Sequence, residues 1–186
     1  MSDDLQAKQH EQCEQWKAQA LKSPFVRFMV SAMEGAGCRV DERYFRCVPC
    51  KETGIGGGLH YDKNGNTSVV LCENRLETQE QATTATVHEL IHAFDNCRSH
   101  QDPENLLHHA CTEIRAASLS GDCHWKLEFL RGNFGIVKQH QACVRRRAIL
   151  SVKMNPACGS EEEAAQAVDQ VWNVCFADTE PFERIP

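Results

Sequence analysis

The sequence predicts a mainly helical α+β fold, in which a small β-hairpin precedes one long helix and disulfide bonds hold the elements together. Three observations lead to this prediction. Apolar residues recur at helical spacing over most of the chain. One short stretch instead reads as two strands around the turn residues 62–66. Finally, 11 cysteines are spread along the 186 residues.

Composition limits the number of domains and the class of partner. No repeat or low-complexity block divides the chain, so we expect residues 1–186 to form a single domain. The 26 acidic and 20 basic residues give a net charge of −6, which argues against a nucleic-acid partner. The first residues resemble neither a signal nor a transit peptide, and no apolar stretch approaches the roughly 20 residues needed to cross a bilayer. We therefore expect a soluble or peripheral protein.

The N-terminal third predicts two helices and an irregular segment. Residues 1–22 are expected to form a satellite helix with a narrow apolar seam, made of Leu5, Cys13, Trp16 and Ala20. Ser23 and Pro24 begin a second helix, which ends at the glycines 35 and 37. Its predicted core stripe consists of Phe25, Phe28, Met29, Ala32 and Met33. Residues 38–50 are either a strand or an irregular stapled segment.

The hairpin comes next, followed by the remaining helices. The glycine-rich residues 54–58 lack the ending of a phosphate loop and predict a flexible entry into strands 59–61 and 67–72. Helices are predicted at 79–97, 103–120, 125–130 and 136–154, with a break at 132–135. A capping box at Ser160–Glu163 begins a final helix, and residues 176–186 form an extended C-terminal tail.

The long helix 79–97 contains an H-E-x-x-H motif, His88-Glu89-Leu90-Ile91-His92. Residues four apart lie on one face of a helix, so His88 and His92 can both bind one zinc ion. Glu89 can then accept a proton from a zinc-bound water as that water attacks a peptide carbonyl. The motif therefore predicts a zinc metalloendopeptidase, the alternative being a coincidental pair of helical histidines.

A catalytic zinc needs a third protein ligand, for which we expect Glu113. This carboxylate falls on an otherwise apolar stripe of helix 103–120, where burial without a partner is costly. Zinc would be such a partner, and His, His and Glu is a known ligand set of zinc peptidases. The alternative is that Glu113 pairs with an arginine, either Arg98 or Arg115.

Asp95 is the competing third ligand, because it lies seven residues after His88 and shares the histidine face. It could bind zinc, orient a ligating histidine, or be an ordinary solvated aspartate. Arg115 and His109 are further candidates for orienting the ligands or contacting the substrate. The strand 67–72 could pair with an extended substrate as an edge strand, or it could be an ordinary strand of the sheet.

The cysteines indicate a disulfide framework rather than a structural zinc site. Only Cys47 and Cys50 form a C-x-x-C pair, whereas structural zinc sites use paired knuckles. Disulfides form in oxidising compartments, yet the usual secretory signal is absent. The mitochondrial intermembrane space reconciles these two observations.

Several longer segments carry a resemblance to a known family. They are His88–Asp95 with Cys97–Arg98, Ala110–Cys123, Cys143–Arg145, Cys175–Phe176 and Pro181–Phe182. From about Cys13 onward the chain resembles the mitochondrial inner-membrane ATP-synthase assembly metalloproteases. The resemblance implies a zincin-like domain with one catalytic zinc, peripheral on the inner membrane and facing the intermembrane space.

The resemblance also implies a substrate, partners and a cysteine pattern. The substrate would be the precursor of an ATP synthase membrane-sector subunit, with help from proteins that present it or take part in assembly. Ten cysteines match the family and Cys158 is an addition, which predicts five bridges and one free thiol. The alternative function is a non-catalytic assembly chaperone with a structural or vestigial zinc site, but the retained Glu89 favours a peptidase.

Overall fold

The computed structural model describes residues 2–51, 54–63, 65–124 and 139–186. The chain divides into two compact units, an N-terminal unit of residues 1–98 and a C-terminal unit of residues 99–186. The expectation of a single domain stays a prediction. The helix predicted at 125–130 and the break at 132–135 lie outside the described residues.

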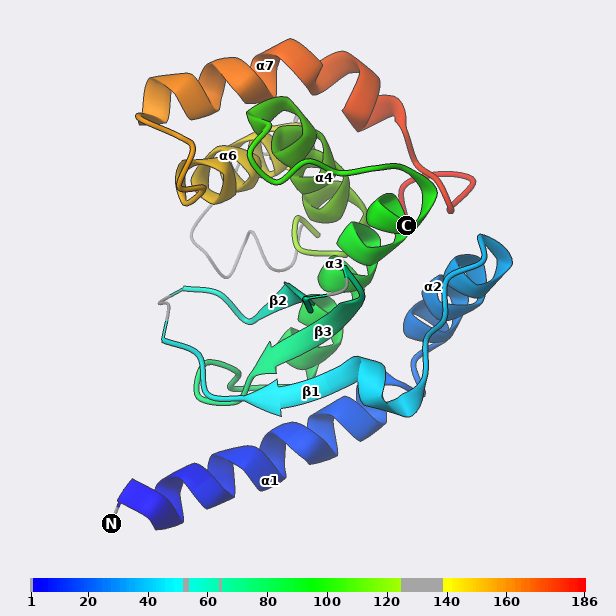
Figure 1. The fold of residues 1–186 in the computed structure, drawn as a ribbon, viewed down its shortest axis with the longest axis vertical. Coiled ribbons are helices and arrows are strands. Elements are labelled where there is room, and N and C mark those ends of the chain that lie inside the picture. The colour runs from blue at the N-terminus through cyan, green and yellow to red at the C-terminus, as the bar shows by residue number, and fades with distance from the viewer. Residues whose placement is uncertain (1, 52–53, 64, 125–138) are drawn as a thin grey trace. The chain divides into compact units, whose positions relative to one another are not determined.

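The N-terminal unit combines three helices with a small sheet (Figure 1). Its elements are the helices α1 (Ser2–Ala20), α2 (Pro24–Gly35) and α3 (Gln79–Arg98), and the strands β1 (Phe45–Val48), β2 (Gly57–Tyr61) and β3 (Thr67–Cys72). Helix α1 packs against β1, and α3 packs against β2 and β3. The predicted α+β class, the hairpin and the long motif helix are therefore confirmed.

The sheet has the order β1-β3-β2, which makes β3 the central strand. Its partner β1 is parallel and its partner β2 is antiparallel, so that Val69 pairs with Phe45 on one side and Leu59 on the other. The turn between β2 and β3 is closed by the Asp62 N–H, which donates to the Asn66 carbonyl oxygen at 2.9 Å. The prediction that 67–72 serves as an edge strand is therefore wrong, because β1 covers its second side.

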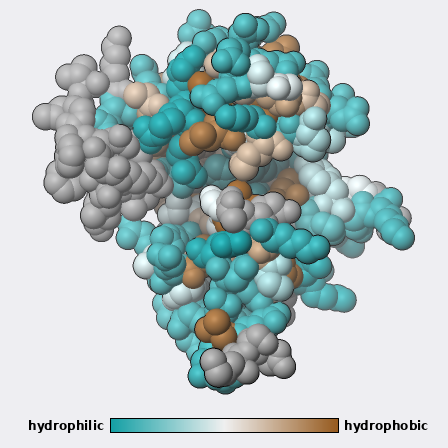
Figure 2. Space-filling view, turned by 90° about the vertical axis from the view of Figure 1, so that its left-hand side faces the viewer, coloured by the Kyte–Doolittle hydropathy of each residue, from teal (hydrophilic) through white to brown (hydrophobic). Residues whose placement is uncertain are grey.

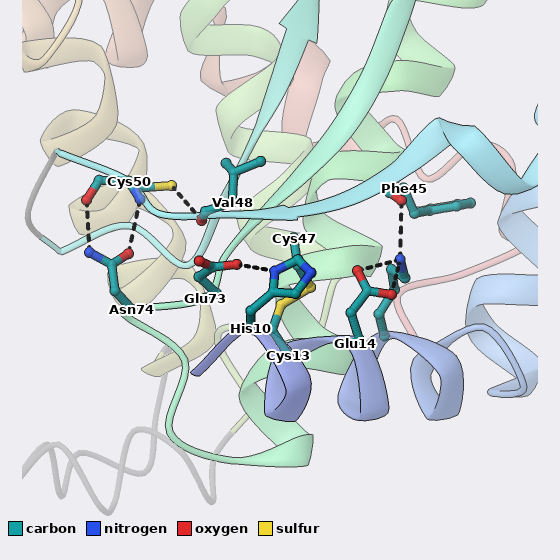
Figure 3. A network of polar contacts seen from close by, with 10 residues as sticks. His10, Cys13, Glu14, Phe45, Cys47, Val48, Cys50, Glu73 and Asn74 are labelled. Atoms are coloured by element: carbon teal, nitrogen blue, oxygen red, sulfur yellow. Dashed lines mark hydrogen bonds and ion pairs between the residues drawn. A yellow bond between two sulfur atoms is a disulfide. The ribbon is translucent and has the colours of Figure 1, made fainter. Parts of the chain in front are cut away.

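Helix α1 is bonded to the sheet near the ends of β1 and β3 (Figure 3). The Cys13–Cys47 disulfide joins α1 to β1. One turn earlier, Nδ1 of His10 lies 2.7 Å from Oε2 of the buried Glu73. The predicted satellite helix is thus tied to the sheet by a covalent bond and a polar contact.

The inner faces of α1 and α2 differ in part from the prediction. Cys13 and Ala20 of α1 are buried, but Leu5 is 58% exposed and does not belong to the apolar seam. In α2 the buried stripe runs through Val26, Met29 and Met33. Phe25 and Phe28 are 38% and 44% exposed, so the prediction that both belong to the core is wrong. Val26, Met29 and Met33 are spaced three and then four residues apart, so they lie on one face of the helix, beside the stripe that was predicted.

The C-terminal unit is helical in its described part. Helix α4 (Leu106–Leu119) packs against α6 (Gln139–Lys153) and α7 (Glu161–Ala177), which also pack against each other. The shared core is made of small and branched apolar residues, among them Ala110, Ile114, Ala117, Val144, Ala148, Val152, Ala164 and Val168. The disulfides Cys111–Cys175 and Cys123–Cys143 close this unit.

The helix starts show where local side-chain bonds decide a boundary. Helix α4 begins at Leu106 rather than at Pro103, because Asn105 is the N-cap and accepts from the Leu107 N–H at 2.9 Å. The Ser160 half of the capping box at α7 is confirmed, since Ser160 Oγ accepts from the Glu163 N–H at 3.1 Å. The Glu163 carboxylate accepts in turn from the Gly159 N–H at 2.7 Å, one residue before the cap.

Five disulfides are present, and Cys158 is the free cysteine. The two bridges of the N-terminal unit not yet named are Cys38–Cys97 and Cys50–Cys72. The predicted disulfide framework is confirmed in number and in its unpaired member. The face seen in Figure 2 is mostly hydrophilic, with apolar residues in small patches. Within the described residues, no helix combines the length and the apolar character needed to cross a membrane.

Candidate active site

The H-E-x-x-H motif lies in the second half of α3, which continues without a break to Arg98. The rings of His88 and His92 lie side by side, with centroids 4.8 Å apart and planes at 74°. Both residues are half-buried. Two residues before His88, the buried Thr86 hydroxyl donates to the Ala82 carbonyl oxygen at 2.7 Å. Helical spacing thus brings the two imidazoles together as predicted.

Glu89 is only 7% exposed and lies against Gly57, the first residue of β2. A Cβ added at Gly57 would come within 3.2 Å of Glu89 Cγ and 2.8 Å of the Val70 carbonyl oxygen. Glycine is therefore the residue that leaves room for the Glu89 side chain and for pairing with β3. The flexible entry predicted for residues 54–58 did not include this role, although the glycine run was the available signal.

Tyr61, at the other end of β2, is electrostatically coupled to the motif. Burial raises the pKa of its phenol, and the negative charge of Glu89 raises this pKa further. A tyrosine hydroxyl is protonated at neutral pH and a raised pKa keeps it so, which allows Tyr61 to donate a hydrogen bond. No sequence pattern predicts a functional role for this residue.

Asp95 is 2% exposed, so the alternative of an ordinary solvated aspartate is wrong. Its Oδ1 lies 3.2 Å from Nη2 of Arg98, and the Arg98 guanidinium also lies over the ring of Phe94 at 5.4 Å. A buried carboxylate paired with arginine is held in one orientation. The suggestion that Asp95 orients a ligating histidine stays a prediction.

Glu113 is 7% exposed and lies on α4 between the buried residues Ala110 and Ala117, as the predicted stripe requires. Its Oε1 is 3.3 Å from Nε2 of His109, one turn earlier on the same helix. His109, a candidate for orienting the ligands, therefore contacts the expected third ligand directly.

Arg115 is 1% exposed and bonds to the segment after α7. Its Nη1 donates to the Asp178 carbonyl oxygen at 2.6 Å and pairs with the carboxylate of the same residue, and Nη2 donates to the Glu180 carbonyl oxygen. These contacts anchor the C-terminal tail, whose helical part extends to Ala177. A role for Arg115 toward substrate stays a prediction.

Among the described residues, one group of histidine and acidic side chains could hold a metal ion: His88, His92 and Glu113. Each offers one ligand atom. Two imidazole nitrogens and one carboxylate oxygen fit zinc, and a set of three protein ligands is typical of catalytic rather than structural zinc sites. Asp95 is not a member of this group.

Comparison with known proteins gives one consistent result. The model of the peptidase M76 family matches residues 11–183. A protein of Schizosaccharomyces pombe named mitochondrial inner membrane protease atp23 is 41% identical over 189 residues, which cover 100% of both chains. The protease ATP23 of Saccharomyces cerevisiae (strain S288c) is 44% identical, over 93% of this chain and 78% of its own. The human homolog is 44% identical over 88% of this chain and 65% of its own. No solved structure matches.

Proposed function

The chain belongs to the peptidase M76 family, and we propose from this membership and from the site that it is a zinc-dependent endopeptidase with a zincin-like fold. The observation that carries the proposal is the donor set His88, His92 and Glu113, together with the buried Glu89 that follows His88 in the motif. The two histidines would each contribute an imidazole nitrogen to the metal and Glu113 a carboxylate oxygen. A bound zinc ion supplies a Lewis acid that polarises a peptide carbonyl and makes water more acidic.

Glu89 would act as the general base. It follows the first histidine directly, and its burial against Gly57 holds the carboxylate in one position. The carboxylate would accept a proton from the attacking water and pass it to the nitrogen of the departing peptide. General base catalysis of this kind contributes about 10² to 10⁴ in rate.

The peptide substrate would bind along β2. This strand pairs with β3 through one edge, whereas β3 is paired on both sides. An extended peptide can add to such a strand through main-chain hydrogen bonds. Gly57, at one end of β2, lies against Glu89, and the charge of Glu89 raises the pKa of Tyr61 at the other end. Main-chain hydrogen bonds depend on few side chains of the substrate. Partners that present the substrate would therefore supply much of the specificity.

The biological assignment follows the relatives and the resemblance. Relatives at 41–45% identity are named mitochondrial inner membrane proteases, and five disulfides favour an oxidising compartment. We therefore propose a peripheral protein on the intermembrane-space side of the inner membrane. Its substrate would be the precursor of an ATP synthase membrane-sector subunit, whose assembly it would assist.

The test compares wild type with Glu89→Gln and His92→Ala in the oxidised, zinc-supplemented protein. Zinc content is measured by atomic emission, and cleavage is measured on the subunit precursor embedded in lipid nanodiscs. We expect wild type to bind one zinc, Glu89→Gln to keep zinc but lose cleavage, and His92→Ala to lose both. Casein serves as a generic substrate and should be cleaved poorly.

The outcomes separate the competing functions. Normal cleavage by Glu89→Gln would remove the proposed base from the mechanism. Absence of cleavage by wild type, together with support of subunit assembly by both proteins, would favour a non-catalytic assembly chaperone. Rapid digestion of casein would argue against presentation by partners.

A further inference from the structure

We propose that Asn155 and His109 are positioning residues that hold the Glu113 carboxylate ready for the metal. The inference rests on the proposed function, in which Glu113 is a zinc ligand. The contacts that carry it all lie within the C-terminal unit: Asn155 follows α6, and His109 and Glu113 are one turn apart on α4.

The side-chain amide of Asn155 has one orientation that satisfies its neighbours. Its Nδ2 lies 2.9 Å from the Pro103 carbonyl oxygen and 2.9 Å from Nδ1 of His109. Its Oδ1 accepts from the Ala157 N–H at 2.9 Å. Reversing the amide would oppose two oxygens at Pro103 and two N–H groups at Ala157, so the hydrogen-bond pattern assigns the amino group to the His109 side.

This orientation determines the tautomer of His109. The amino group of Asn155 can only donate, so Nδ1 of His109 must be the acceptor. A neutral imidazole that accepts at Nδ1 carries its proton on Nε2. Nε2 lies 3.3 Å from Oε1 of Glu113, and His109 therefore donates this proton in a hydrogen bond to the carboxylate.

The hydrogen bond orients the carboxylate without neutralising it. A neutral imidazole occupies one acceptor position on Oε1 and leaves the negative charge and the other lone pairs for a cation. The His109 side chain is 23% exposed and that of Glu113 is 9% exposed, so this contact is shielded from much of the solvent. Residues that orient metal ligands in this way typically change metal affinity about 10- to 100-fold when they are replaced.

Asn155→Asp tests the inference, because it is nearly isosteric and has no amino group to donate. In the full-length oxidised protein, we expect zinc affinity to fall about 10- to 100-fold, measured by competition with a chromophoric chelator. Nitrogen-15 NMR of the metal-free protein should find the His109 proton on Nε2 in wild type and a changed protonation pattern in Asn155→Asp. Asn74→Asp is the matched control, since Asn74 bonds to both backbone groups of Cys50 in the N-terminal unit and should leave zinc affinity unchanged.

A second pair of variants covers the case in which Asn155→Asp fails to fold. His109→Gln keeps a side-chain amino group that can donate to Glu113, whereas His109→Ala keeps none. Zinc affinity of His109→Gln should therefore lie nearer to wild type than that of His109→Ala. Equal loss in both variants would overturn the positioning role.

Glu113→Ala separates this inference from the proposed function. Unchanged zinc affinity in Glu113→Ala would refute the ligand assignment itself. If Glu113→Ala loses zinc while folded Asn155→Asp binds it like wild type, the ligand assignment stands and the positioning inference fails. A wild-type His109 proton found on Nδ1 would also overturn the inference.

Discussion

The two compact units position their functional residues through neighbours that are separated by very different distances along the chain. In the N-terminal unit His88, Glu89 and His92 occupy one helix, and a helical repeat is enough to place the two histidines together. In the C-terminal unit Glu113 is contacted by His109, which is itself bonded to Asn155, 46 residues further on. The first arrangement follows from secondary structure, whereas the second depends on α4 packing beside the turn after α6.

The disulfides join residues at very different distances along the chain in both units. Cys50–Cys72 closes 22 residues between the ends of neighbouring strands, and Cys111–Cys175 closes 64 residues between α4 and α7. A bridge across a longer loop removes more entropy from the unfolded chain. Loss of the Cys111–Cys175 bridge should consequently lower stability more than loss of the Cys50–Cys72 bridge.

The largest predicted effect on stability is the loss of that bridge. Replacing Cys111 and Cys175 by alanine should lower the free energy of unfolding by about 4 kcal/mol, against about 3 kcal/mol for Cys50 and Cys72. Urea unfolding under non-reducing conditions measures both, and hydrogen exchange should locate the first loss in α4 and α7. A loss below about 1 kcal/mol for the long bridge would contradict the entropic argument.

The next effect concerns the space around Glu89 in the N-terminal unit. Gly57→Ala should lower kcat/KM by up to on the order of 100-fold, because the new methyl group would meet the Val70 carbonyl oxygen at 2.8 Å and Glu89 Cγ at 3.2 Å, so that both the strand and the carboxylate must shift. Gly58→Ala is the matched control in the same strand, since a Cβ there meets nothing within 4 Å. Similar activity of the two variants would show that the contact at Gly57 does not position the base.

Loss of a helix cap should have a smaller effect on stability, and this effect should differ between α7 in the C-terminal unit and α2 in the N-terminal unit. Ser160→Ala should cost about 1 kcal/mol of stability, because its hydroxyl accepts from the Glu163 N–H at the start of α7. Ser23→Ala at the start of α2 should cost less, because Ser23 makes no side-chain cap hydrogen bond. Thermal unfolding of the two variants measures the difference, and an equal shift in Tm would argue against the capping assignment.

The smallest effect is a pH dependence in the C-terminal unit. Burial lowers the pKa of His140 below its ordinary value, although the bond to the Ser118 carbonyl oxygen raises it in part. Between the two values the unfolded chain binds more protons, so this contribution is present above about pH 6.5 and is lost as pH falls through the folded pKa. His140→Asn should flatten the dependence of unfolding free energy on pH from 7.5 to 5. An unchanged slope would exclude His140 as its source.

The sequence by itself determined the features that depend on short spacing. The four-residue interval between His88 and His92 follows from helical geometry, and the hairpin follows from its turn residues. The cap at Ser160 and the apolar stripe around Glu113 are also local patterns. Each of these patterns involves residues that are close together in the sequence, so it could be recognised without the tertiary structure.

Only the tertiary structure decided the features that join distant segments. It placed β1 parallel to β3 and so made β3 a central strand, which a hairpin pattern does not predict. It set Gly57 against Glu89, bonded Arg115 to the tail at Asp178, and selected one set of disulfide partners among many. Contacts of this kind depend on how whole elements pack against one another. Packing between distant segments produces no periodic pattern in the sequence around the residues that make the contact.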